Sequence, residues 1–126
     1  YATLEDACER MQSENPHLSA EQAQHLTIHG ANQNEDGTFS WKFDNYVRSF
    51  PPTGVPFEET AEMYRDITCP TMLVRGLESW AADPIEDGRV NNFTCPLTVE
   101  PFEKAGHWVH HDQLDGFVDK VRLFLD

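Results

Sequence analysis

The sequence is poor in basic residues and in cysteine, and both shortages narrow what the chain can be. Its 126 residues hold 9 Lys and Arg against 22 Asp and Glu, which gives a formal net charge of −13. Such a charge repels nucleic acid and anionic membrane surfaces, so neither is an expected partner. Three cysteines do not make a disulfide framework. We therefore expect reduced thiols, as in a cytoplasmic protein.

Long apolar runs are also missing from the sequence. No stretch approaches the roughly 18 apolar residues that a membrane span needs, and no charged and then apolar leader stands at the start. The first residue is Tyr1 rather than Met, which predicts a processed, trimmed or incomplete chain. The length and the 39% of hydrophobic residues are typical of one ordinary compact domain.

The first part of the chain predicts two helices followed by a polar loop. Apolar residues in 3–14 recur at i, i+3, i+4 and i+7, which is one stripe on a helix. A second helix is predicted over 19–30, because Ser19 and Gln22 have the spacing of a capping box. Residues 31–37 are polar and contain an Asp-Gly turn signal, so we expect a loop there.

The middle of the chain changes character twice. In 39–43, aromatic residues alternate with polar ones, which predicts an extended segment. The Pro- and Gly-rich segment 49–56 then predicts a hinge between two regions. A short helix over 57–65 follows, and one further helix is expected near 85–92.

Two short strands are expected in the second half, at 71–74 and 97–100. The first is an apolar run that predicts a buried strand. A Thr-Cys-Pro motif stands directly before each of them, so both strands begin at the same offset. Strands separated by a helix-length segment pair in parallel with a right-handed crossover. A final helix is predicted over 114–125, where apolar residues recur at helical spacing.

Several segments in this order resemble the C-terminal half of the α/β-hydrolase fold. They are Cys-Pro-Thr-Met-Leu-Val-Arg-Gly at 69–76, Glu78, Ala-Gly-His-Trp at 105–108, and His-His-Asp-Gln at 110–113 before the last helix. The resemblance implies an α/β fold with two parallel strands and flanking helices. Residues 1–48 would then be a helical cap segment with its return to the core, and 49–126 the C-terminal part of the core.

The resemblance implies a catalytic role for His107. Enzymes of this family use a nucleophile, a histidine base and an acid that orients the histidine. Gly106 allows a sharp turn that leaves the imidazole of His107 exposed above the sheet. A neutral imidazole can accept a proton at neutral pH and return it later. The alternative is a buried structural histidine.

The orienting acid is less well defined by the resemblance. The family usually places an Asp three residues after the glycine that ends the strand, and here that residue is Ser79. Glu78 lies one residue earlier and Asp83 four residues later. We prefer Glu78, because its extra methylene lets it reach the histidine from a shifted backbone position. Asp83, or an acid on an earlier strand outside the chain, remains an alternative, and Glu78 would then be a solvated loop residue.

The sequence contains no nucleophile of the expected kind. There is no Gly-x-Ser-x-Gly elbow and no Asp or Cys in such an elbow. The five serines, Ser13, Ser19, Ser40, Ser49 and Ser79, all lack flanking glycines in that pattern. By the family order, the nucleophile and the oxyanion hole would precede Tyr1. We therefore expect no triad catalysis from these residues alone.

Two parallel strands make a poor sheet by themselves. The open edge of the strand at 71–74 should be covered by an N-terminal half, a second chain or a swapped copy. The parent enzyme would hydrolyse an ester or related bond of a small apolar substrate, as esterases, epoxide hydrolases and dehalogenases do, without a cofactor. The alternative is a catalytically inactive truncated chain that dimerises or binds a partner through this edge.

Aromatic, histidine and cysteine side chains are further candidates for binding roles. Trp108 and Trp80 are the best candidates for substrate binding near His107, while Trp41 and Phe43 could equally be ordinary packing. His25 and His29 share a helix face, but no third ligand is placed for a metal, and we expect none there. The same holds for the cluster of His107, His110 and His111. Cys69 and Cys95 each lie two residues before a predicted strand, in the same register, so a disulfide between them is conceivable. Two packed thiols are the default expectation.

Overall fold

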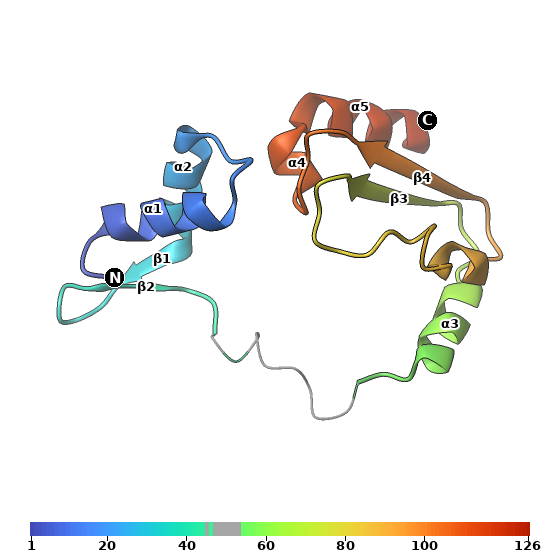
Figure 1. The fold of residues 1–126 in the computed structure, drawn as a ribbon, viewed down its shortest axis with the longest axis horizontal. Coiled ribbons are helices and arrows are strands. Elements are labelled where there is room, and N and C mark those ends of the chain that lie inside the picture. The colour runs from blue at the N-terminus through green and yellow to red at the C-terminus, as the bar shows by residue number, and fades with distance from the viewer. Residues whose placement is uncertain (45, 47–53) are drawn as a thin grey trace. The chain divides into compact units, whose positions relative to one another are not determined.

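The computed structural model describes residues 1–44, 46 and 54–126, and the chain divides into two compact units, Tyr1–Pro52 and Thr53–Asp126 (Figure 1). The expected boundary at residue 48 and most of the expected hinge at 49–56 lie outside the described residues. The assignment of the first region as a cap and of the second as core therefore stays a prediction.

Both predicted helices of the first unit are present. Helix α1 spans Leu4–Glu14 and α2 spans Ala20–Gly30. Thr3 caps α1 and Ser19 caps α2, each in a capping box. The second box is confirmed as expected, because Gln22 N donates to Ser19 Oγ (3.1 Å) and Ser19 N donates to Gln22 Oε1 (2.9 Å).

Small side chains form the core of the first unit. Ala7 on α1 and Ala23 on α2 are fully buried, and Leu18 between the helices is nearly so. Thr27 is buried as well, and its hydroxyl donates to the Ala23 carbonyl at 2.7 Å. These small residues let the two helices approach closely while the single buried hydroxyl keeps a hydrogen bond.

The expected loop at 31–37 is partly wrong, because its first three residues form a strand. Strands β1 (Ala31–Gln33) and β2 (Phe39–Trp41) make an antiparallel hairpin. The turn signal itself is confirmed, since Gly37 has a φ of 84°. The pairing with β2 supplies the hydrogen bonds that make β1 extended. Polar Asn and Gln residues gave no sequence signal for it.

The second unit contains the parallel strand pair that the sequence predicted. Strand β3 spans Thr71–Gly76 and β4 spans Leu97–Phe102, with Thr71 opposite Leu97. Each strand is two residues longer than expected. The first five residues of β3 are half-buried rather than buried, because among the described residues β4 is the only strand that pairs with it.

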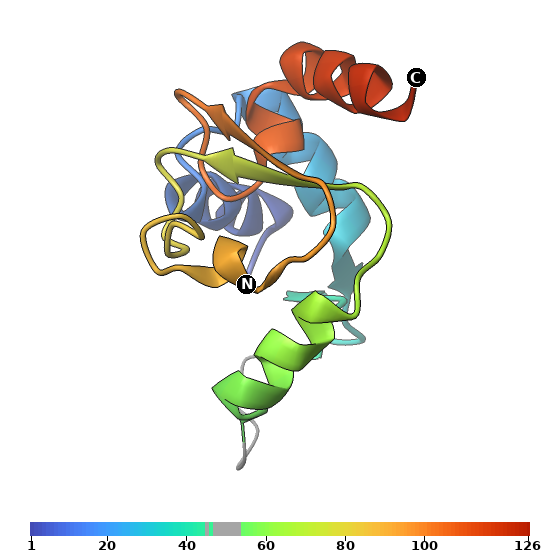
Figure 2. The same cartoon turned by 90° about the vertical axis from the view of Figure 1, so that its right-hand side faces the viewer.

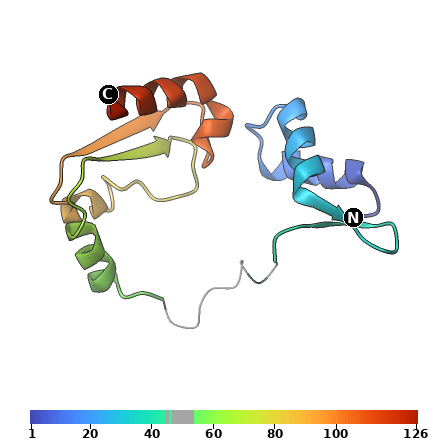
Figure 3. The ribbon, with the colours of Figure 1, turned by 180° about the vertical axis from the view of Figure 1, so that it is seen from behind.

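Helices flank this strand pair. Helix α3 (Phe57–Arg65) has the predicted bounds, and its Tyr64 ring stacks on Phe93, with ring centroids 4.9 Å apart. The helix expected near 85–92 is only a short 3₁₀ turn, η2 (Arg89–Asn92). Figures 2 and 3 show this turn at the end of the strand pair where α3 lies.

The C-terminal segment contributes two helices. Helix α4 (Val109–Asp112) is a single turn that the sequence did not predict, and α5 (Leu114–Leu125) has the predicted bounds. Figures 1 and 3 show α5 alongside β4, and Lys120 Nζ pairs with Glu100 Oε2 at 2.7 Å.

Candidate active site

The candidate site is built on the turn that follows β4. Ala105 and Gly106 are buried, whereas the next two residues, His107 and Trp108, are exposed. Val109, which begins α4, is buried again. The backbone is therefore anchored on both sides of a histidine that projects outward.

Three contacts fix the position of this turn. Glu78 N donates to the Ala105 carbonyl at 3.0 Å. Gly106 N donates to Asp112 Oδ2 at 2.7 Å. Gly76, the last residue of β3, lies so close that a Cβ on it would overlap the Ala105 and Gly106 carbonyl oxygens. Residue 76 must be a glycine here because the turn packs directly on its backbone.

The imidazole of His107 is surrounded on three sides. Ser79 Oγ lies 3.0 Å from His107 Nδ1. The indole of Trp80 stacks on the imidazole, with centroids 4.3 Å apart and planes 29° apart. Trp108 meets it edge-on, with centroids 4.8 Å apart. Both tryptophans expected beside His107 therefore do contact it.

Ser79 makes a contact with His107 that the sequence did not predict. Its amide donates to the Gly76 carbonyl at 3.1 Å, and its Oγ accepts the Ala81 amide at 3.1 Å. These bonds aim the hydroxyl at His107. The signal in the sequence is its place three residues after Gly76, where the resemblance implies an acid, but a hydroxyl carries no negative charge.

The two acids considered for orienting His107 differ in their surroundings. Asp83 Oδ2 pairs with Arg75 Nη1 at 3.1 Å, and both side chains are largely buried. Its carboxylate is thus engaged by a charge-assisted contact with Arg75. The Glu78 backbone is bonded to Ala105, so residue 78 lies beside the turn that carries His107.

Four of the five other histidines form two neighbouring pairs. The His25 and His29 rings lie 4.5 Å apart, and the His110 and His111 rings 4.2 Å apart. Burial, followed by the nearby charge of His110, lowers the pKa of His111 below its ordinary value of 6.5. No group of three or more His, Cys, Asp or Glu side chains within the described ranges is arranged to hold a metal ion.

The cysteines are free thiols. Cys95 Sγ donates to Thr71 Oγ1 at 3.5 Å across the strand pair, while Cys69 is exposed. The conceivable disulfide between Cys69 and Cys95 is not formed.

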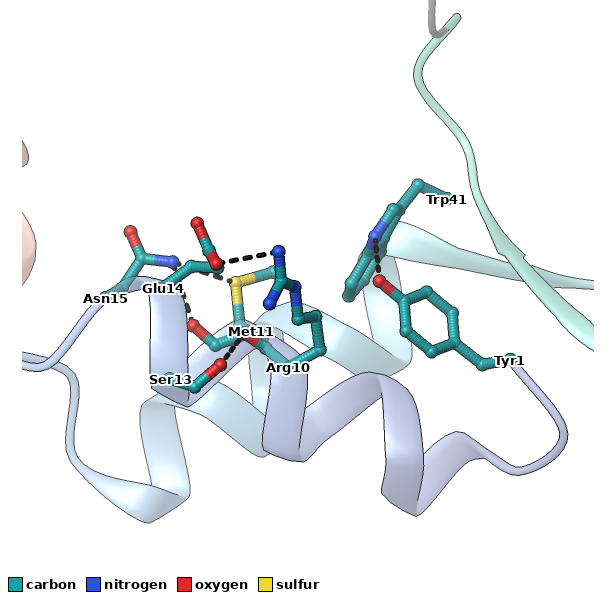
Figure 4. Close-up of polar contacts among 7 residues, drawn as sticks. All are labelled: Tyr1, Arg10, Met11, Ser13, Glu14, Asn15 and Trp41. Carbon is teal, nitrogen blue, oxygen red and sulfur yellow. Dashed lines mark hydrogen bonds and ion pairs between the residues drawn. The ribbon is translucent and has the colours of Figure 1, made fainter.

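Trp41 and Phe43 line a separate cavity of about 250 Å³ in the first unit. Their rings lie nearly parallel, with centroids 6.4 Å apart. Trp41 Nε1 donates to Tyr1 Oη at 3.2 Å, and Arg10 pairs with Glu14 at 2.8 Å on the neighbouring helix (Figure 4). Figure 4 also shows the bond from Asn15 Nδ2 to the Met11 carbonyl.

In the part of the chain that the structure describes, no helix is both long and apolar enough to cross a membrane.

No family model matches the chain. It is 25% identical over 97 residues to the sn-1-specific diacylglycerol lipase ABHD11 of Mus musculus, a match that covers 71% of this chain and 28% of that protein. The chain thus spans less than a third of that relative's length.

Solved structures of α/β-hydrolases match the whole chain. The Mycobacterium tuberculosis esterase Rv0045c has a TM-score of 0.82 and 23% identity, with 100% of this chain and 42% of the esterase covered. A thioesterase domain from the curacin biosynthetic pathway has a TM-score of 0.78 and 23% identity, with 100% and 43% covered. The parallel strand pair and its flanking helices therefore form the C-terminal portion of an α/β-hydrolase fold.

Proposed function

We propose that this chain supplies the histidine base of an α/β-hydrolase whose nucleophile lies outside the 126 residues. The observation that carries the proposal is the His107 turn. It presents an exposed imidazole from a buried, hydrogen-bonded turn at the end of a parallel strand. In such a hydrolase, Nε2 of His107 would take the proton from the nucleophile and later give it to the leaving group.

We further propose that Glu78 is the acid that supports His107. The hydrogen bond from its backbone amide to the Ala105 carbonyl holds residue 78 beside the histidine turn. Asp83 is the weaker candidate because Arg75 binds its carboxylate. Ser79 makes the direct contact with Nδ1, so a hydroxyl would hold the ring while Glu78 supplies the negative charge that favours imidazolium.

The substrate proposed is a small, largely apolar molecule with an ester or related bond. The relatives named as a lipase, an esterase and a thioesterase support this bond type. Trp80 and Trp108 would form the apolar wall beside the reacting bond. Trp80 is 82% exposed, so the indole face that does not stack on His107 is open to a ligand. No cofactor is proposed.

The test is hydrolysis of a short-chain p-nitrophenyl ester by the full-length gene product and by the isolated chain. We expect the isolated chain to be inactive. In the full-length protein, His107→Ala should lower kcat at least about a thousandfold, and Glu78→Gln more than about a hundredfold. Asp83→Asn should cost little.

His110→Ala is the matched control, because His110 is an exposed histidine three residues along the same segment. A His107→Ala enzyme that is as active as the His110→Ala control would contradict the proposal.

A second candidate function rests on the exposed apolar surface of α5. Leu114, Leu123 and Leu125 are 58%, 74% and 75% exposed. An inactive chain could bury this surface, and the open edge of β3, by pairing with a second copy or with an N-terminal half. Sedimentation equilibrium of the isolated chain tests self-pairing. A mass of 14.4 kDa that does not rise with concentration would rule out the second copy.

A further inference from the structure

We infer that Asp112 is a positioning residue that holds the His107 turn in its working conformation through Gly106. The inference rests on the proposed role of His107 as general base. It assigns to Asp112 a task that neither Glu78 nor Ser79 performs, because Asp112 acts on the backbone of the turn and not on the imidazole.

The hydrogen bond between Gly106 and Asp112 is short, and its donor is buried. Asp112 Oδ2 accepts the Gly106 amide at 2.7 Å in a half-buried setting. An amide donor and a carboxylate at this distance form a charge-assisted hydrogen bond, which is about twice as strong as a neutral one. Because Gly106 is buried, its amide would be left without a strong acceptor if the carboxylate were removed.

The bond closes a loop around His107. The chain leaves Gly106, passes through His107 and Trp108, and turns through α4 before Asp112 returns to Gly106. Within this loop, the Trp108 carbonyl accepts the His111 amide at 2.7 Å. Buried Val109 anchors the middle of the loop. The closed loop leaves the backbone on either side of His107 little freedom to shift.

The consequence is a defined distance between His107 and Ser79. The Nδ1–Oγ contact of 3.0 Å joins the histidine turn to the loop after β3, and it is lost if the turn moves. Displacements of about 1 Å at a catalytic group cost on the order of a hundredfold in rate. Loss of the Asp112 bond should thus affect the imidazole even though this bond goes to the Gly106 amide and not to the imidazole.

The experiment uses ¹⁵N NMR of the isolated chain and needs no substrate. It compares the wild type with Asp112→Ala and Asp112→Asn and reads two signals. These are the exchange rate of the Gly106 amide and the ring-nitrogen shifts of His107, which report its tautomer. Asp119→Ala, an exposed acid on α5, is the matched control.

In Asp112→Ala we expect Gly106 exchange to rise by at least about tenfold, as expected for loss of a hydrogen bond to a charged group. The His107 shifts should move toward those of an unbound imidazole. Asp112→Asn keeps an acceptor oxygen, so it should retain most of the wild-type signals. If Asp112→Ala does not fold, the Gly106 exchange rate of Asp112→Asn decides the matter. Its neutral acceptor makes a weaker bond than the carboxylate, so Gly106 should exchange faster than in Asp119→Ala, and equal rates would overturn the inference.

Unchanged His107 shifts in Asp112→Ala would overturn the inference. So would an Asp112→Asn variant that loses the His107 signals as completely as Asp112→Ala. Both readouts are independent of turnover. A full-length protein that stays active after His107→Ala would refute the proposed function without altering the NMR result, so the two failures are distinguishable.

Discussion

Replacing Gly76 with Ala should displace the candidate catalytic turn. The added Cβ would overlap the carbonyl oxygens of Ala105 and Gly106 and lie 2.8 Å from the Ala105 carbonyl carbon. In folded proteins, a Cβ atom essentially never lies within 3.0 Å of a heavy atom outside its own residue and its chain neighbours. The atoms that would have to yield are backbone atoms of a hydrogen-bonded turn, so they cannot move as the end of a flexible side chain can.

The expected magnitude follows from this overlap. Inserting a group into a packed site costs typically about 1–3 kcal/mol of unfolding free energy. The turn has to retreat by roughly 1 Å, a displacement that at a reacting group costs on the order of a hundredfold in rate. The bond from Glu78 N to the Ala105 carbonyl should weaken at the same time.

Two measurements on the isolated chain test this prediction. Urea unfolding gives its stability, and the ring-nitrogen NMR shifts of His107 report the contact with Ser79. Gly54→Ala is the control, because a Cβ on Gly54 meets nothing within 4 Å. We expect Gly76→Ala to unfold at clearly lower urea than Gly54→Ala and to lose the Ser79 contact. A Gly76→Ala chain with the stability and His107 shifts of the control would refute the close-packing argument.

Three further predictions concern single side chains. Ser19→Ala should lower the unfolding free energy by about 1 kcal/mol through loss of the α2 cap. Urea unfolding measures this loss against the control Ser13→Ala, which removes a hydroxyl that donates to the Arg10 carbonyl within α1 and caps no helix. Ser79→Ala should lower the rate of ester hydrolysis by roughly tenfold, which corresponds to the free energy of one hydrogen bond. An unchanged rate would show that the contact with Nδ1 does not contribute to catalysis. Because burial lowers the pKa of His111 below 6.5, the unfolded state takes up the proton first, so stability should fall as the pH drops through 6.5. His111→Gln should flatten that dependence in unfolding curves recorded across this pH range, and an equal slope in both proteins would contradict it.

Elements with a complete local signal could be predicted from the sequence. Helix α5 carries apolar residues at helical spacing and has the bounds that this spacing predicts. The helix-length segment between the two strands predicted the parallel pairing of β3 with β4, with weak support from the repeated Thr-Cys-Pro entry motifs, and Thr71 does lie opposite Leu97. Both features follow from patterns and spacings along the chain.

Elements created by distant contacts could not be predicted. Strand β1 is extended because β2 pairs with it, and its own residues have no strand preference. The single turn of α4 lies within the loop that the hydrogen bond between Gly106 and Asp112 closes. The contact of Ser79 with His107 joins residues 28 positions apart, and its chemistry differs from the carboxylate that the family pattern suggested.

The central claim is that His107 activates a nucleophile that lies outside these 126 residues. The most direct measurement is labelling of the full-length gene product with a fluorophosphonate probe, followed by mapping of the modified residue by mass spectrometry. We predict a modified serine outside Tyr1–Asp126, with labelling lost in His107→Ala and kept in His110→Ala. A modified serine among the 126 residues, or labelling that survives His107→Ala, would contradict it.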